Sequence, residues 1–157
     1  MPEMTEYDSW KAMEAAEYLN AVRRSCLDVK RLQDEIDTQR ALFPPGMDSS
    51  ERVKSSPSPD KLELAALRII EMVEQYTTEL MEWVELQRDA HEAVRKMEDA
   101  RYRAVLTLYY LDGHSWETVG DRIGYEWNYC RELRTQALPL FWEAMPRHAK
   151  TNVPRAD

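Results

Sequence analysis

The stretch YLDGHSWETVGDRIGY, residues 110–125, decides how the C-terminal third of this chain folds. Gly113 is expected to end one helix, because glycine readily adopts the left-handed turn that follows a helix. Ser115 is a good N-cap for a short helix over residues 116–123, and Gly124 ends that helix in turn. Two helices joined by so short a glycine turn cross steeply, which is typical of a helix-turn-helix.

The residues on either side supply the other helices of this motif. Asp99 is expected to cap a preceding helix, and a following helix runs from about Trp127 towards Leu138, where Pro139 should end it. Gly120 is a small residue at the point where the two helices of the motif touch. The predicted inner-face positions are Ala104, Val105, Leu108, Leu111, Val119, Ile123, Tyr125, Cys130 and Leu133.

The outer face of the last helix carries side chains suited to reading DNA. Asn128 and Arg131 are of the types that form bidentate hydrogen bonds with adenine and guanine in the major groove. Arg101, Arg103 and Arg122 are candidate phosphate contacts. The predicted DNA-binding set is Ser115, Arg122, Glu126, Trp127, Asn128, Arg131, Arg134 and Thr135. The alternative for these residues is a plain solvated face.

Residues 110–125 resemble the start of the helix-turn-helix of sigma-70 region 4. Its usual form is Tyr-Leu-x-Gly-x-Ser-aromatic-x-x-Ile-Ala-x-x-apolar-Gly. Over most of residues 18–142 the chain resembles a phage-borne family of small sigma-70 region 4-like proteins, related to the ArpU and RinA-like late transcription regulators. The resemblance implies a transcription regulator of phage or prophage origin that binds promoter double-stranded DNA in the cytoplasm of a bacterial host cell. Host RNA polymerase is a further partner that it implies.

The N-terminal hundred residues predict two long helices. No Gly or Pro occurs from Thr5 to Phe43, and the proline pair that follows should end the first helix there. Its apolar stripe is Leu19, Val22, Cys26, Val29, Leu32 and Ile36, with gaps of three and four residues. A second helix should begin at Asp60. Its apolar heptad positions are Leu62, Ala66, Ile69, Val73, Tyr76, Leu80, Trp83, Ala90, Val94 and Met97.

These patterns predict an all-α protein in which a long antiparallel helical hairpin, a coiled coil, precedes a C-terminal helix-turn-helix bundle. We expect the hairpin over residues 1–98, with a flexible Pro/Ser-rich loop at 44–59. The helix-turn-helix bundle should occupy 99–145 and a disordered tail 146–157. Whether the two long helices pair within one chain or between chains stays open. The additional apolar residues Leu64, Ile70, Val84 and Leu86 favour dimerisation or a third packing partner, and a homodimer is expected.

The net charge also differs between the N-terminal and C-terminal parts of the chain. Residues 1–100 carry 13 Lys/Arg and 22 Asp/Glu, a net charge of −9, whereas residues 101–157 carry 8 and 7, a net charge of +1. Nucleic acid should repel the acidic part, so only the C-terminal part is expected to tolerate a phosphate backbone.

Several classes of protein are excluded by what the sequence lacks. A membrane span needs about 20 apolar residues, and the longest runs without a charge are far shorter, so no membrane partner is expected. The N-terminus has no apolar segment of a secretory signal. Two cysteines and three histidines fit no disulfide, zinc or catalytic pattern, and no glycine loop for phosphate is present. We therefore expect neither an enzyme nor a cofactor or metal site.

Two other functions remain open besides a DNA-binding regulator. One alternative is that the region 4-like module is a protein-interaction module that binds RNA polymerase without touching DNA. The combination of a helix-turn-helix with a helical oligomer is also typical of small-terminase-like packaging proteins, for which a ring of eight or more subunits is expected.

Overall fold

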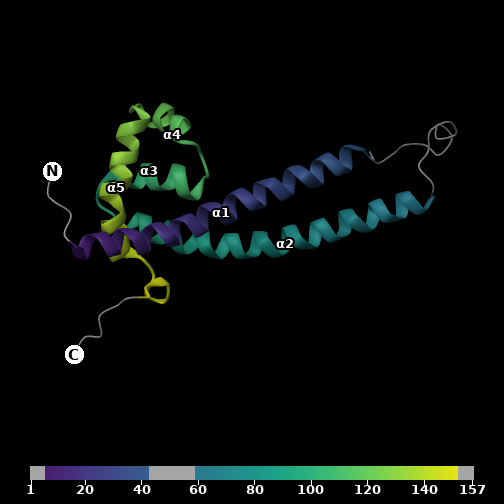
Figure 1. Cartoon of the computed structure of the whole chain (residues 1–157), viewed down its shortest axis with the longest axis horizontal. Coiled ribbons are helices and arrows are strands. Elements are labelled where there is room, and N and C mark those ends of the chain that lie inside the picture. The colour runs from purple at the N-terminus through teal and green to yellow at the C-terminus, as the bar shows by residue number, and fades with distance from the viewer. Residues whose placement is uncertain (1–5, 43–58, 152–157) are drawn as a thin grey trace. The chain divides into compact units, whose positions relative to one another are not determined.

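The computed structural model describes residues 6–42 and 59–151, and it is all-α over that range. Figure 1 shows two long helices and three shorter ones. In chain order the elements are α1 (Glu6–Leu42), α2 (Pro59–Arg95), α3 (Ala100–Leu106), the π-helical turn η2 (Thr107–Leu111), α4 (Trp116–Ile123), α5 (Trp127–Ala144) and the 3-10 turn η3 (Arg147–Ala149). The predicted fold class, a helical hairpin followed by a helix-turn-helix bundle, is confirmed.

The chain divides into two compact units, and both contain parts of the long helices. The bundle unit comprises Met1–Leu27 and Trp83–Asp157, and the hairpin unit comprises Asp28–Glu82. This division differs from the predicted boundary near residue 99. The first turns of α1 and the last turns of α2 share one hydrophobic core with α5. For this reason they belong to the bundle unit.

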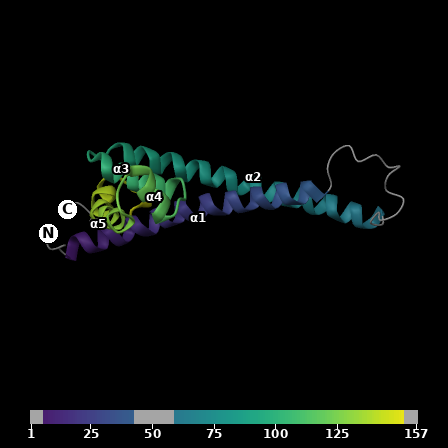
Figure 2. The same ribbon diagram turned by 90° about the horizontal axis from the view of Figure 1, so that it is seen from above.

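In the hairpin unit, α1 and α2 run antiparallel and pack together within one chain, as Figure 2 shows. Val29, Leu32 and Ile36 of α1 are buried, as their spacing predicted. The heptad positions of α2 in this unit are only half buried, and Ala66 is exposed. The predicted flexible loop lies outside the described residues, except for Pro59, at which α2 begins.

The bundle unit holds the larger hydrophobic cluster. Four of its helices contribute buried side chains: Leu19 and Val22 from α1, Ala90, Ala93 and Val94 from α2, Leu106 from α3, and Ala137, Phe141 and Trp142 from α5. A smaller cluster of Val105, Val119, Cys130 and Leu133 joins α3, α4 and α5. Cys130 is fully buried, which confirms its prediction as a small core residue.

The prediction that the last helix ends at Leu138 is wrong, because α5 continues through Pro139 to Ala144. A proline inside a helix costs about 3 kcal/mol. However, the continuation buries Phe141 and Trp142 in the core, and each large apolar side chain contributes about 1.5–3 kcal/mol when fully buried. Packing therefore outweighs the penalty for the proline.

The helix before the motif is also not the single α-helix that was predicted. Its last turn is π-helical, and the amide of Asp112 donates to the carbonyl of Thr107 at 2.9 Å. The wider turn rotates the side chains after Leu106, so that Tyr110 and Leu111 are buried while Leu108 is half buried.

The prediction of a disordered tail is wrong for its first six residues. Residues 147–149 form η3, and Ala149 packs against the larger cluster. The amide and hydroxyl of Thr151 both donate to the carboxylate of Glu14. This carboxylate also accepts from the indole nitrogen of Trp142 at 2.6 Å, so a buried charge on α1 holds the segment in place. The rest of the predicted tail, 152–157, lies outside the described residues.

Candidate nucleic-acid interface

The helix-turn-helix consists of α4, the turn at residues 124–126 and α5, and local signals set its ends. The hydroxyl of Ser115 accepts from the amide of Thr118 at 3.3 Å, which confirms Ser115 as the N-cap of α4. Gly124 has φ of +76° and ends α4 in the left-handed conformation. Glu126 is the N-cap residue of α5, but its side chain makes no capping hydrogen bond.

Gly120 lets the start of α5 approach α4 closely. A Cβ atom at this position would lie 2.6 Å from the carbonyl oxygen of Tyr125 and 3.3 Å from the amide nitrogen of Trp127. Real Cβ atoms do not tolerate a backbone atom at the first of these distances. The predicted role of Gly120, a small residue where the two helices touch, therefore agrees with this geometry.

Four of the predicted DNA-binding side chains share the outer face of α5. Trp127, Asn128, Arg131 and Thr135 are all exposed, and their spacing places them along one side of the helix. The guanidinium of Arg131 lies 5.8 Å from the centre of the Trp127 ring, at the edge of the range for a cation–π contact. The arrangement presents an amide, a guanidinium and an aromatic ring side by side to solvent.

The other exposed members of the predicted set lie around this face. Glu126 directly precedes it at the N-terminus of α5, and Arg122 is exposed in the last turn of α4. Ser115 is exposed too, although its hydroxyl is already used in capping α4.

Arg134 differs from the prediction, because its side chain turns inward. Its Nε atom is buried, and the guanidinium carbon lies 5.5 Å from the centre of the Trp116 ring. Burial raises the pKa of the Tyr110 hydroxyl, and the positive charge of Arg134 offsets part of this rise. The inward position makes Arg134 a packing residue between α5 and the segment before α4.

A stack of two aromatic rings between two arginines fixes the start of α4, and sequence reasoning missed it. Tyr109 and Trp116 are parallel, with ring centres 3.9 Å apart and an interplanar angle of 12°. Arg23 covers the outer face of Tyr109 at 4.0 Å, while Arg134 lies over Trp116. We refer to these four residues as the Arg23–Arg134 stack. The two outer contacts are of the cation–π kind, and the central one is a stack of two aromatic rings.

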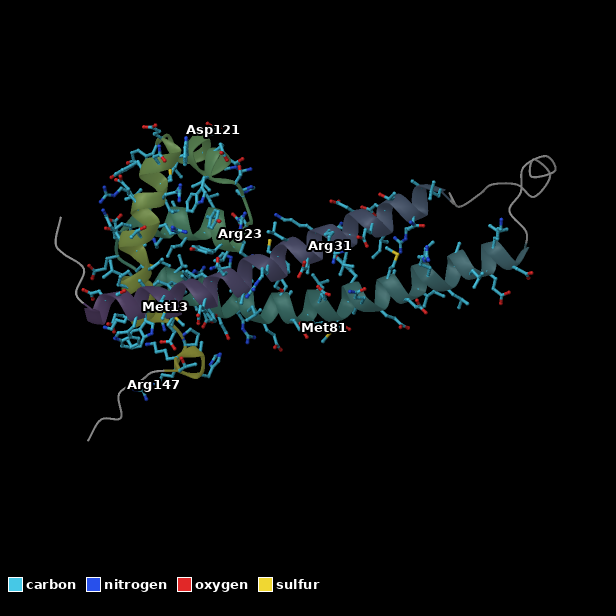
Figure 3. All side chains as sticks on the ribbon, in the orientation of Figure 1. Met13, Arg23, Arg31, Met81, Asp121 and Arg147 are labelled. Carbon is cyan, nitrogen blue, oxygen red and sulfur yellow. The ribbon has the colours of Figure 1, made fainter. Side chains whose placement is uncertain are left out.

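Arg23 is the member that no local signal identifies. Its guanidinium donates to the carbonyl of Tyr109 and, at 3.0 Å, to that of His114. Both carbonyls belong to the π turn and the loop after it. Figure 3 labels this residue on α1. Arg23 thus joins α1 to the loop that leads into α4, across 91 residues of sequence.

Arg101 and Arg103, predicted as phosphate contacts, bind other protein groups. Arg101 pairs with Asp99 at 2.9 Å and donates to the hydroxyl of Tyr129 at 3.2 Å. Its hydrogen bonds and, to a lesser extent, its charge lower the pKa of the Asp99 carboxyl. Arg103 donates to the carbonyls of Met97 and Glu98 just after α2.

The motif has few cations left for a phosphate backbone. Residues 99–145 contain five Arg and seven Asp/Glu, a net charge of −2. Three of these arginines are engaged as described above, so Arg122 and Arg131 are the two whose guanidinium groups remain on the exposed face. The prediction of Tyr125 as a core residue is wrong: its side chain is 41% exposed, and its ring packs edge-on against that of Tyr129, with ring centres 5.1 Å apart.

Other kinds of site have little support in the part of the chain that the structure describes. Among residues 6–42 and 59–151, no three His, Cys, Asp or Glu side chains are grouped so that they could hold a metal ion. Within the same ranges, no helix combines the length and the apolar character that a membrane span requires. Burial raises the pKa of the Cys130 thiol, as expected of a core cysteine.

No family model, no curated protein and no solved structure matches this chain.

Proposed function

We propose that this chain is a transcription regulator of phage or prophage type, and not an enzyme, that reads double-stranded promoter DNA with the outer face of α5. The observation that supports the proposal is the exposed row of Asn128, Arg131 and Thr135 on the second helix of a helix-turn-helix. In such motifs this helix enters the major groove and the residues near its N-terminus contact base edges. Asn and Arg supply the bidentate hydrogen bonds that discriminate adenine and guanine.

The charge of the motif determines how the protein would bind. With Arg131 contacting a base, Arg122 is the exposed cation of the motif left for the backbone, so each bound copy neutralises about one phosphate. The logarithm of the binding constant should then fall with the logarithm of the salt concentration with a slope of about −1 per copy. Base contacts rather than phosphate contacts would carry most of the affinity.

Replacement of Arg131 tests the proposal directly. Arg131→Ala should weaken binding to the specific site by about 1–3 kcal/mol and relax the preference at one base pair. Fluorescence anisotropy with labelled DNA from the protein's own genomic neighbourhood, measured across a salt series with competitor DNA, gives both quantities. The matched control is Arg31→Ala, which removes the same charge from an exposed arginine on α1 that pairs with Glu35.

Two results would contradict the proposal. Specific binding by Arg131→Ala with undiminished discrimination would remove α5 as the reading element. No binding of the unchanged protein at about 10 μM and low salt would be weaker than non-specific affinity usually is.

The exposed aromatic pair favours a second candidate function, a module that binds RNA polymerase without contacting DNA. Tyr125 and Trp127 are both about 40% exposed, and large aromatic side chains are enriched at protein interfaces. The acidic balance of residues 99–145 suits a protein partner better than a phosphate backbone. Capture of polymerase in the presence of nuclease, lost in Trp127→Ala and kept in Arg131→Ala, would favour this function over the first.

A further inference from the structure

One flank of α2, about 100° around the helix from its packed positions, carries a row of exposed apolar side chains. Leu67, Ile70, Met81 and Val84 are between 51% and 67% exposed. They follow one another at heptad spacing, with Glu74 and Thr77 as the two polar members in the middle. We call these six residues the outer stripe. All of them lie on one continuous helix, so helix geometry alone aligns them. Figure 3 labels Met81 on the side of α2 that faces away from α1.

The outer stripe has the same order of apolar and polar residues in both directions along the helix: two apolar, two polar, two apolar. A second copy of α2 running antiparallel therefore matches it. Two copies of α2 that run antiparallel about a two-fold axis between Gln75 and Tyr76 place Leu67 opposite Val84 of the second copy. The same axis places Ile70 opposite Met81 of the second copy. Each pair then occurs twice, because a two-fold interface brings residue i to j and j to i.

The polar positions are compatible with the same pairing. Glu74 faces Thr77 of the second copy, so the two polar members of the stripe meet each other and not an apolar side chain. The hydroxyl of Thr77 donates within its own helix, to the carbonyl of Val73 at 2.8 Å. Just beyond the apolar pairs, Glu63 faces Arg88 of the second copy, and Asp60 faces His91 of the second copy. All four side chains are exposed. Arg88 has only a neighbouring partner, Asp89, at 3.7 Å.

A parallel arrangement lacks this complementarity. It would place Glu63 beside Glu63, Glu74 beside Glu74 and Arg88 beside Arg88, and like charges across a helical interface oppose association. The charges therefore select the antiparallel pair over the parallel one.

We propose that the outer stripe is the interface of a homodimer in which two α2 helices pack antiparallel. This interface does not depend on DNA binding. It would give each dimer two copies of the α4–α5 motif. Four apolar residues per copy form a small interface, so the dimer should dissociate measurably on dilution.

Sedimentation velocity of the full-length chain over a concentration series tests the oligomeric state. We expect a reversible monomer–dimer equilibrium, and Leu67→Glu should raise its dissociation constant at least about tenfold. Leu140→Glu is the matched control: it changes an equally exposed leucine on α5, outside the stripe, and should leave the constant unchanged. Circular dichroism confirms that both variants remain helical.

Charge reversal tests the orientation. Glu63→Arg alone should weaken the dimer, since it places two arginines opposite each other, and the double variant Glu63→Arg/Arg88→Glu should restore it. Oxidative cross-linking gives a second measure. An equimolar mixture of Leu67→Cys and Val84→Cys chains should link efficiently, whereas Leu67→Cys alone should not. Cys26 and Cys130 are buried and interfere little.

The proposal is wrong if the chain is monomeric at all concentrations, or if it forms a ring of eight or more subunits. It is equally wrong if Leu140→Glu weakens the dimer as much as Leu67→Glu does. Preferential cross-linking of Leu67→Cys to itself, or failure of the double charge variant to restore association, would overturn the antiparallel orientation.

Discussion

The apolar positions of α2 are buried to very different extents in the two units, whereas the apolar stripe of α1 is buried in both. In the bundle unit, Leu19 and Val22 of α1 and Ala90 of α2 are fully buried, because α3 and α5 add side chains to the same cluster. In the hairpin unit, the two helices have only each other, and the facing positions of α2 stay half buried. A two-helix layer can cover one stripe per helix, whereas a third layer is needed to cover more.

This difference in burial suggests that the two units have different roles. The bundle unit has the contacts that hold a recognition helix in a fixed orientation, such as the Arg23–Arg134 stack. The hairpin unit keeps apolar surface exposed on α2, which is the kind of surface that marks an interaction site.

The largest expected effect is a difference in stability between core substitutions in the bundle unit and in the hairpin unit. Phe141→Ala should lower the free energy of unfolding by about 3–5 kcal/mol, because it leaves a cavity among fully buried neighbours. Val73→Ala in the hairpin unit should cost only about 1 kcal/mol, because Val73 is half buried. Urea denaturation followed by circular dichroism measures both. Equal losses would mean that the two units are packed equally well.

An intermediate effect distinguishes two arginines on one helix, both labelled in Figure 3. Arg23→Met keeps an apolar stem but deprives the carbonyls of Tyr109 and His114 of their donor, at a cost of about 1.5–3 kcal/mol. Arg31→Met removes only an exposed pair with Glu35, for which less than about 0.5 kcal/mol is expected.

The same denaturation experiment measures these two variants. The Arg23 variant should also lose near-ultraviolet ellipticity from the stacked Tyr109 and Trp116 rings. An unchanged aromatic signal would argue against Arg23 as the residue that orders the stack.

The smallest effect concerns Tyr18 in the bundle unit. Burial, reinforced by the charge of Asp89, raises the pKa of Tyr18 to about 12 from an ordinary value of 10. The folded state therefore holds this proton more tightly than the unfolded state. Stability from this group is fully present below pH 10 and is lost as the pH rises from 10 to 12.

Tyr18→Phe should accordingly flatten the decline of stability between pH 10 and 12. At neutral pH it should be almost neutral, because the Tyr18 hydroxyl is buried without a hydrogen-bond partner. Denaturation at a series of pH values checks both statements. A decline as steep as that of the unchanged chain would assign the alkaline loss to other groups.

Much of the fold could be predicted because its signals are local. The buried stripe of α1 follows from the spacing of its apolar residues, and Asp99 and Ser115 cap α3 and α4 as expected. Gly113 and Gly124 both have positive φ, at the turns where glycine was expected to supply it. Each of these features depends on residues within about one turn of helix.

The candidate site could be predicted only in part. The helical period places Asn128, Arg131 and Thr135 on one exposed face. It does not place Arg134, whose side chain turns inward because Tyr110 and Trp116 offer it a partner there. Exposure of an arginine depends on what the neighbouring elements provide, and those elements are distant in sequence.

The sequence by itself determined where α1 and α4 begin and end, where α3 and α5 begin, and which stripe of α1 is apolar, because helix caps, breakers and periodicity act within a few residues. Only the tertiary structure decided that α5 continues through Pro139, that the helix before the motif ends in a π turn, and that residues 146–151 pack on the bundle. These outcomes depend on contacts between distant residues, such as Glu14 with Thr151 across 137 positions. The free energy of such contacts can outweigh a local preference, but no local pattern records it.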